Sequence, residues 1–439
     1  MLKVLRSTDE NAGLAAYSRP QRRKSPLRIR SEEKESLLCV FRDRDERAFL
    51  AHLFVPCLHR SEPLFGRGVG RSLEESDDQQ VTCRLIAGKI GLNPKPVARL
   101  QIGHRGDWQA FPAARNFRFH DGETLPTLHL HYLTLGTLHR DSQGHTDNAI
   151  LLLHGTGGSA RSLLAPQFSN ELFGPGQPLD ITKYFLIFPD DIGHGQSSKP
   201  SDGLHMHFPA YDYDDMVVSQ HAMLVDGLHV DHLRLILGTS MGCMQTFVWG
   251  ETFPGFSNAL APFACLPVEI AGRNRMMRYM AIDAVKRDPA WKNGEYTAEP
   301  VLGLRTASEM IFIMTSAPLQ MQKNYPTRVT AEHRVDEYLD RAVAQTDAND
   351  LIYYFNASRN YNPAPKLSTI TAPVLWINSA DDFVNPPELG IAERMVSQMP
   401  HAHFFLLPIS DATRGHGTHT FAAVWKNHLI DFLSQTGKK

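Results

Sequence analysis

Short runs of apolar residues recur along the chain from about residue 108 onward. Runs of this kind are typical of parallel strands that are buried on both faces of a sheet. They predict strands at AILLLHG (149–155), YFLIFPD (184–190), LRLILG (233–238), NALAPFAC (258–265), PVLWINS (373–379) and HFFLLP (403–408). Ahead of them, FRFHDG and LHLHYLTLG predict two extended segments joined by a turn around Asp121 and Gly122.

Helical patterns alternate with these runs. Residues 214–228 begin with acidic side chains and place Val218, Ala222 and Val225 on one helical face. The segment MGCMQTFVWGETF predicts a helix that Pro254 ends. Because strands alternate with helices over short links, the fold class is predicted to be α/β, with a doubly wound, mostly parallel sheet.

A long helical stretch interrupts this alternation. Between Leu266 and about Thr371 the strand patterns stop and helical patterns take over. We therefore expect a core at 106–265 and 372–439, with a helical cap, or lid, at 266–371 inserted before the last two strands. Such a cap would cover the C-terminal ends of the strands, where ligands bind in sheets of this kind.

Residues 1–105 differ from the rest of the chain. They carry the basic run RPQRRKSPLRIR, which is followed by mixed and acidic segments, and their apolar residues keep no sustained period. One interpretation is a regulatory or nucleic-acid-binding tail. We favour a poorly ordered or non-core extension, because no aromatic residues interleave the basic run and acidic residues follow it closely.

Charge and hydropathy narrow the range of partners and locations. Among 439 residues, 45 basic side chains nearly balance 47 acidic ones, for a net charge of −2, so neither nucleic acid nor a membrane is expected as a partner. No apolar run is long enough to span a bilayer, and the N-terminus lacks the apolar stretch of a secretion signal. The chain as written is expected in the cytoplasm; a misassigned start site would leave a secreted or periplasmic location open.

The five cysteines are odd in number, scattered and without C-x-x-C spacing, so we expect neither a disulfide framework nor a zinc site built from cysteines. The H-x-H pairs at 129/131, 205/207 and 401/403 have no accompanying carboxylate pattern, and we interpret them as structural, with no metal.

The strongest chemical signal is the segment Gly238-Thr239-Ser240-Met241-Gly242, which fits G-x-S-x-G between a predicted strand and a predicted helix. This is the context of a nucleophile elbow, in which a sharp turn lifts the serine hydroxyl above the sheet. Residues two positions to either side of the serine must be very small. We therefore predict Ser240 as the nucleophile.

A serine hydroxyl needs a base, and the base needs an orienting acid, in the chain order Ser, Asp or Glu, His. Asp381 and Asp382 both follow the strand PVLWIN, and we favour Asp382 because a proline four residues on turns the loop back toward a helix. For the base we favour His416, in a Gly-His-Gly loop, over His419, which is expected to belong already to the final helix.

The transition state also needs donors for its oxyanion. The segment His154-Gly-Thr-Gly-Gly follows a predicted strand, and the backbone N–H groups of Thr156 and Met241 are the candidate donors. A phosphate-binding loop is a weaker alternative, because the Gly-Lys-Ser/Thr ending is missing. The nearby Asp190, Asp191 and His194 are expected to shape a loop, with substrate contact as the alternative.

From about residue 117 to residue 433 the chain resembles the homoserine O-acetyltransferase family of the α/β-hydrolase superfamily. The resemblance is carried by DMVVSQ, GTSMGCMQTFVWGETFP, the cap text RDPAWKNGEY…PVLGL and the acid loop DDFVNPP. It implies the α/β-hydrolase fold, a triad of Ser240, Asp382 and His416, and a helical lid that often makes a homodimer contact. It also implies acetyl-CoA or another acyl-CoA as co-substrate if the chain is an acyltransferase.

Two positions depart from this family. Its arginine for the substrate carboxylate falls on Ser308 here, and Arg305 lies nearly one helical turn away. Its aspartate after the triad histidine is replaced by Gly417. Without these charge partners for a zwitterionic amino acid, homoserine is not expected as the acceptor.

Three functions follow, in order of preference. The first is a serine-dependent hydrolase of small-molecule esters that acts through an acyl-enzyme on Ser240 and needs no cofactor. The second is an acyl-CoA-dependent O-acyltransferase with an acceptor other than homoserine. The third is a non-catalytic binding protein on the same fold.

Overall fold

The computed structural model describes residues 36–42, 48–54 and 109–436, with side chains from residue 116 onward. The chain divides into two compact units, Met1–Pro94 and Lys95–Lys439. In the first unit, β1 (Ser36–Arg42) and β2 (Ala48–Phe54) pair antiparallel. The remainder of the predicted N-terminal extension lies outside the described residues.

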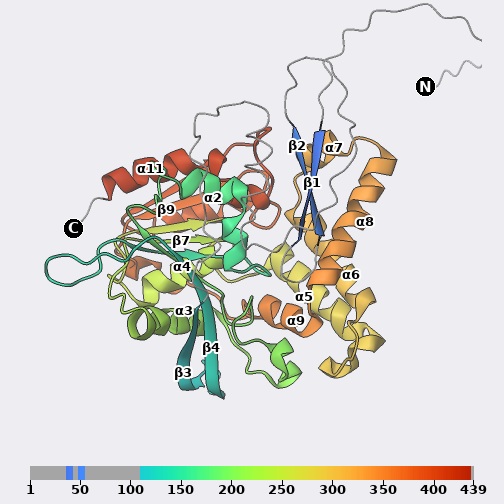
Figure 1. Ribbon diagram of the computed structural model, residues 1–439, viewed down its shortest axis with the longest axis horizontal. Coiled ribbons are helices and arrows are strands. Elements are labelled where there is room, and N and C mark those ends of the chain that lie inside the picture. Colours follow the sequence, from blue (N-terminus) through green and yellow to red (C-terminus); the bar gives the residue numbers. More distant parts are fainter. Residues whose placement is uncertain (1–35, 43–47, 55–108, 437–439) are drawn as a thin grey trace, which may run out of the picture. The chain divides into compact units, whose positions relative to one another are not determined.

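The second unit is built on an eight-stranded sheet with the order β10-β9-β8-β7-β5-β6-β4-β3 (Figure 1). Strands β5 to β10 run parallel to one another, and the β3–β4 hairpin, which turns near Gly122, is joined to β6 through the antiparallel strand β4 at one edge. The predicted α/β class and mostly parallel sheet are therefore confirmed. The strands are β3 (Gln109–Arg118), β4 (Thr124–Leu135), β5 (Ala149–Leu153), β6 (Phe185–Pro189), β7 (Leu235–Thr239), β8 (Leu260–Phe263), β9 (Val374–Ser379) and β10 (Ala402–Leu407).

Helices cover both faces of this sheet. On one face, α3 and α4 pack against Leu151, Leu153 and Ile236, and on the other, α2 and α11 pack against Ile150 and Leu237. Neighbouring residues of one strand thus serve opposite layers, because side chains alternate along a strand. The helices are α2 (Pro166–Leu172), α3 (Tyr213–Ala222, continued by a π turn at Met223–Gly227), α4 (Met241–Thr252), α10 (Ile391–Val396) and α11 (Lys426–Gln435). Short 3-10 turns lie at Ala160–Leu164, Pro200–Asp202, His205–His207, Pro289–Gly294, Ala364–Thr369, Pro387–Leu389, Gly417–Thr420 and Ala422–Val424.

Two of the predicted elements are buried differently from what the pattern indicated. Strand β10 is the edge of the sheet, so it is not a buried strand, and Phe405 is 40% exposed. On α3 the predicted buried face is wrong, since Val218 is 44% exposed. The helix instead buries Met216, Val217 and Gln220. The sequence pattern did not indicate this face, because Gln220 is polar. Its burial is explained by its hydrogen bonds with Asp191 and Trp249.

The cap is helical, as predicted, and lies in the chain between β8 and β9 (Figure 1). It has its own apolar cluster, in which Met277, Leu304 and Leu351 are fully or almost fully buried. Among the helices of residues 109–436, none combines the length and apolar character needed to cross a membrane. The cap helices are α5 (Gly272–Arg287), α6 (Val301–Thr315), α7 (Pro318–Asn324), α8 (Arg328–Gln345) and α9 (Ala348–Asn356).

The cysteines, for which no disulfide framework was expected, form one disulfide among the described residues. Cys243 and Cys265 are joined by a disulfide, and both are buried. Cys243 lies in the first turn of α4, and Cys265 follows the end of β8. Spacing along the chain does not reveal the bond, because the two cysteines meet only when α4 packs beside β8. The bond therefore ties the helix after Ser240 to the strand end that leads into the cap.

Candidate active site

Ser240 occupies the sharp turn between β7 and α4. Its φ of 56° and ψ of −107° lie in a region that residues other than glycine rarely adopt. A Cβ on Gly238 would lie 1.9 Å from the carbonyl oxygen of Gly242, and a Cβ on Gly242 would lie 2.4 Å from that of Leu153. Both positions flanking the serine therefore require glycine, which is the steric rule behind the motif.

The structure brings together the three residues predicted to act as nucleophile, base and acid. The Ser240 Oγ lies 2.8 Å from the Nε2 of His416, and the Nδ1 of His416 lies 2.9 Å from the Oδ2 of Asp382. Both distances are within hydrogen-bonding range. The two bonds connect the C-terminal ends of β7 and β9 with the loop after β10. Ser240 is partly exposed, whereas His416 is 8% and Asp382 1% exposed.

The Asp382 carboxylate is held by several donors besides the imidazole. Its Oδ1 accepts from the backbone N–H of Val384 and its Oδ2 from the side-chain amide of Asn385. Burial alone would raise the pKa of Asp382, but the charge and hydrogen bond of His416, with the donors on Asn385 and Val384, outweigh it and lower the pKa. The acid is therefore kept ionised beside the base.

The two alternative residues have different neighbours. Asp381 accepts from the hydroxyl of Ser379 at 2.5 Å and from the N–H of Gly415 at 3.0 Å, so it holds the histidine loop and does not contact the imidazole. The Nδ1 of His419 lies 2.5 Å from the carbonyl oxygen of His416, and burial lowers the pKa of His419 to about 3. We expected His419 in the final helix, and this prediction was wrong. His419 lies in a 3-10 turn, because α11 begins only at Lys426.

The loop after β5 contains Thr156, the first of the two predicted oxyanion donors. The carbonyl oxygen of Gly155 accepts from the Nδ1 of His154 at 2.9 Å and from the N–H of Gly158 at 3.0 Å. In a trans peptide the next N–H, that of Thr156, points the opposite way. A Cβ on Gly155 would lie 3.3 Å from the Ser240 Cβ, so this loop passes directly beside the nucleophile.

The second predicted donor, the N–H of Met241, lies at the start of α4. Within residues 109–436, neither it nor the N–H of Thr156 donates a hydrogen bond to another group. The first N–H groups of a helix have no partner in the helix, and they carry its positive dipole end. The elbow and the loop are fastened together, because the N–H of Gly242 donates to the carbonyl oxygen of His154 at 2.9 Å.

A buried polar network supports this loop from beneath. The Asp191 carboxylate accepts from the side-chain amides of Gln220 at 2.5 Å and Gln245 at 2.8 Å. The backbone N–H of Asp191 donates to the Nε2 of His154 at 3.3 Å. Trp249 donates to Gln220 at 2.7 Å. Burial raises the pKa of Asp191, and the attraction of His154 and the two amides oppose the shift. Sequence reasoning placed Asp191 in a loop but missed its partners on α3 and α4, which no local pattern indicates.

Asp190 and His194, from the same segment, also have structural neighbours. Asp190 binds the Nδ1 of His131 at 2.7 Å and the N–H of Ala160, which links β4 to the turn after the oxyanion loop. The ring of His194 stacks on Tyr354 of the cap, and burial lowers the pKa of His194 to about 3. Of the pair at 129/131, His131 is buried beside Asp190, whereas His129 is exposed.

The described residues contain one group whose geometry could hold a metal ion, namely His120, Asp212 and Asp214 at the start of α3. Asp212 is already bound by the ring of His120 at 2.8 Å and by Asn360 at 2.7 Å. Its Oδ1 also caps α3 through the N–H of Asp215. These contacts show that Asp212 caps α3 and connects it to the segments of His120 and Asn360.

The two positions that depart from the resembled family, Ser308 and Gly417, lie on α6 and directly after His416. Ser308 is 3% exposed within α6 and presents no charge. Arg305 binds Asp336 at 3.0 Å and Asp340 at 3.4 Å on α8, so its charge is engaged on the surface of the cap. Gly417 begins the 3-10 turn after His416 and carries no side chain.

Comparison with known proteins shows the family of the chain. The family model described as alpha/beta hydrolase fold matches residues 148–411, which is more than half of the chain. The chain therefore belongs to the alpha/beta hydrolase fold family. Within it, the chain resembles homoserine O-acetyltransferases: that of Citrifermentans bemidjiense is 30% identical over 322 residues, covering 64% of this chain and 84% of the relative. That of Geobacter sulfurreducens is 29% identical over 337 residues, covering 67% and 88%.

Solved structures with the same fold include both hydrolases and transferases. An acetylester hydrolase from Corynebacterium glutamicum superposes with a TM-score of 0.66 at 20% identity, over 75% of this chain and 96% of that one. The homoserine O-acetyltransferase from Bacillus anthracis superposes with a TM-score of 0.65 at 22% identity, over 74% and 96%. At these identities the likeness establishes the fold alone.

Proposed function

We propose that this protein hydrolyses small-molecule esters through an acyl-enzyme on Ser240. One observation carries the proposal: the Ser240 hydroxyl, the His416 imidazole and the Asp382 carboxylate form a continuous pair of hydrogen bonds of 2.8 and 2.9 Å. A serine is a weak nucleophile until a base removes its proton, and an imidazole is effective when a carboxylate holds its other nitrogen.

In the first half-reaction the Ser240 Oγ attacks the carbonyl carbon of the ester while His416 takes the hydroxyl proton. The carbonyl oxygen becomes an oxyanion, and the N–H groups of Thr156 and Met241 are the donors that stabilise it. The intermediate collapses by breaking the bond to the alcohol oxygen, which receives the proton from His416. Asp382 stabilises the imidazolium in between.

In the second half-reaction a water molecule replaces the alcohol. His416 takes a proton from the water as its oxygen attacks the acyl carbon, and the proton returns to the Ser240 Oγ as the acid leaves. The partly exposed Ser240 and the absence of a charged clamp at Ser308 and Gly417 favour water over an amino-acid acceptor. No cofactor takes part in this scheme.

Acyl transfer is the second candidate, because the curated relatives are named homoserine O-acetyltransferases. It shares the first half-reaction and differs only in the group that resolves the acyl-enzyme, with an acyl-CoA as donor and an alcohol as acceptor. A non-catalytic binding protein is the third, and the intact hydrogen-bonded chain at Ser240 argues against it.

Hydrolysis of p-nitrophenyl acetate, with and without candidate alcohols and an acyl-CoA, separates these functions. We expect acetate and nitrophenol to form in water alone at a rate that alcohols change little. If product appears only when an acceptor alcohol is present, the hydrolase proposal fails and acyl transfer stands. If wild type and Ser240→Ala are equally inactive toward every ester, both enzymatic proposals fail.

A further inference from the structure

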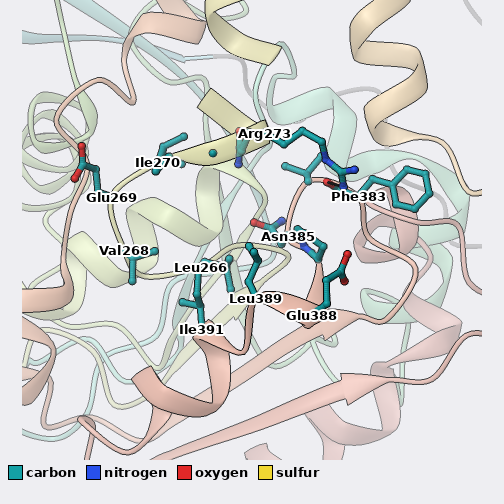
Figure 2. A pocket seen from close by; sticks show the side chains of 15 residues that line it. Leu266, Val268, Glu269, Ile270, Arg273, Phe383, Asn385, Glu388, Leu389 and Ile391 are labelled. Carbon is teal, nitrogen blue, oxygen red and sulfur yellow. Dashed lines mark hydrogen bonds between the residues drawn. The ribbon is translucent and has the colours of Figure 1, made fainter. Parts of the chain in front are cut away.

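An apolar cavity of about 350 Å³ lies between the start of the cap and the acid loop (Figure 2). Its size falls within the range of small-molecule sites. One wall comes from the segment between β8 and α5 and the other from the segment after Asp382. The apolar side chains that line it are Leu266, Val268, Ile270, Phe383, Val384, Leu389 and Ile391.

Charged side chains at this cavity are exposed to solvent. Glu269, Arg273 and Glu388 are all exposed, and Arg273 donates to the carbonyl oxygen of Phe383 at 2.9 Å and lies over its ring. Two carboxylates beside one engaged arginine disfavour an anionic group such as a carboxylate inside the cavity. The cavity therefore suits an uncharged hydrocarbon group.

The cavity shares a wall with the catalytic acid. Asn385, which lines it, donates to the Oδ2 of Asp382 at 3.0 Å and to the carbonyl oxygen of Ala264 at 3.0 Å. Asn385 is buried, so its apolar neighbours and the acid are separated by one side chain. This places the cavity beside the imidazole–carboxylate pair and not elsewhere on the cap.

The opposite wall leads back to the nucleophile. The N–H of Ser240 donates to the carbonyl oxygen of Phe263, and Leu266, three residues further on, lines the cavity. Three residues span at most about 11 Å. Because this span is an upper bound, a medium-length acyl chain on Ser240, which gains about 1.3 Å for each carbon, is long enough to reach the wall at Leu266.

A second cavity, of about 410 Å³, has the opposite character. It lies against the oxyanion loop and is lined by polar side chains of the core and cap, among them Ser159, Lys199, Ser201 and Asp350. An ester consists of an acyl part and an alcohol part, and the alcohol must leave while water enters. The polar cavity suits the alcohol and water, which leaves the apolar cavity for the acyl chain.

We propose that the apolar cavity holds the acyl chain of the substrate, and that the protein prefers esters of medium-chain acids over acetate esters. This rests on the proposed ester hydrolysis. Burial of each methylene raises kcat/KM about fourfold, because apolar burial in the transition state is worth about 0.8 kcal/mol per CH2. The chain remains in place through both half-reactions, since only the alcohol is exchanged.

The test compares two esters of identical composition, methyl nonanoate and octyl acetate, together with p-nitrophenyl acetate and octanoate. We expect wild type to prefer methyl nonanoate over octyl acetate, and octanoate over acetate, by at least tenfold in kcat/KM. Val268→Trp, which fills the cavity, should lower the octanoate-to-acetate ratio at least tenfold. Val268→Ala, which enlarges it, should move the preference toward longer chains.

Val218→Trp, at an exposed position of α3 outside the cavity, is the matched control and should keep the ratio of wild type. An active wild type that favours octyl acetate, or a ratio unchanged in both Val268 variants, overturns the acyl-chain assignment while ester hydrolysis stands. If Val268→Trp does not fold, Val268→Ala alone decides. A wild type that hydrolyses none of the four esters overturns the proposed function, and the acyl-chain assignment with it.

Discussion

The sheet core and the helical cap are built under different constraints. In the core, Ser240 and His416 are held by backbone hydrogen bonds and buried partners, and the two layers over the sheet leave little freedom. The cap has one smaller apolar cluster and exposes many large apolar side chains. Those exposed on the cap are Met276, Tyr279, Met280, Val301, Leu302, Ile313, Leu319 and Val329.

This difference suggests that the core carries out the reaction and that the cap determines which substrate is used. The groups proposed to perform the chemistry all lie at strand ends of the core, where close packing and glycine requirements fix them. Of the two positions that depart from the resembled family, Ser308 lies on the cap helix α6, whereas Gly417 lies next to His416 in the core. Changes in the core are therefore expected to abolish activity, and changes in the cap to alter substrate choice, pH response or assembly.

The largest effect is expected for Ser240→Ala. Removing the nucleophile should lower kcat by about 10⁴-fold or more, because the residual rate rests on substrate binding and oxyanion donors alone. Steady-state assays with p-nitrophenyl esters measure the change in kcat. The thermal unfolding temperature should be unchanged. Ser434→Ala, at an exposed serine of α11, is the matched control and should retain full activity.

Asp382→Asn is expected to lower kcat about 10³- to 10⁴-fold, since an amide cannot stabilise the imidazolium or hold the required tautomer. The neighbouring Asp381→Asn should cost about tenfold at most, because Asp381 binds Gly415 and not the imidazole. Equal losses in the two variants, measured under the same conditions, would show that the acid has been assigned to the wrong carboxylate.

Removing the disulfide is expected to affect stability more than chemistry. The variant with Cys243→Ala and Cys265→Ala should lose about 3 kcal/mol in the free energy of unfolding, because the unfolded chain is no longer constrained across 22 residues. Denaturant unfolding measures this. Reductant should bring wild type to the level of the variant and leave the variant unchanged, and a wild type insensitive to reductant would contradict the bond.

The cap should become less stable with rising pH. Burial, together with the charge of Asp347, raises the pKa of Glu299 to about 7, so the native state holds this proton more tightly than the unfolded chain. Its stabilising contribution is present below about pH 4.5 and is lost as the pH rises to about 7. Glu299→Gln should reduce the fall in Tm between pH 5 and pH 8 by about 1–3 °C, whereas Glu393→Gln on α10 should not.

The smallest effect on activity is expected from the exposed apolar surface of the cap. We propose that a second copy of the chain covers it, because the cap leaves many large apolar side chains exposed and homodimers are the commonest assemblies. Leu302→Asp, at a side chain that is 72% exposed, should halve the mass measured by light scattering while kcat stays within twofold. Val218→Asp is the control, and a wild type of monomer mass would refute the dimer.

The sequence predicted the sheet well because its central strands are buried on both faces and read as uninterrupted apolar runs. The edge strand β10 gave a similar run, although half of it faces solvent, since a sequence does not state which strand is last in the sheet. The face of α3 was misjudged because burial there includes Gln220, whose polarity is satisfied by Asp191 and Trp249.

At the site, local rules found the residues whose backbone geometry is special. The elbow around Ser240 requires glycine at fixed positions, and this requirement is visible in the sequence. Features that depend on distant elements were not visible. The network around Asp191 joins four segments, the disulfide depends on α4 packing beside β8, and the apolar cavity depends on the start of the cap meeting the acid loop.

The central claim is that Ser240 is an activated nucleophile, and covalent labelling tests it most directly. The protein is treated with a fluorophosphonate, digested and analysed by peptide mass spectrometry. We predict one adduct, on the peptide that contains Ser240, with no adduct there in Ser240→Ala and strongly slowed labelling in His416→Ala. An unlabelled wild type, or equal labelling of wild type and Ser240→Ala, would contradict the account.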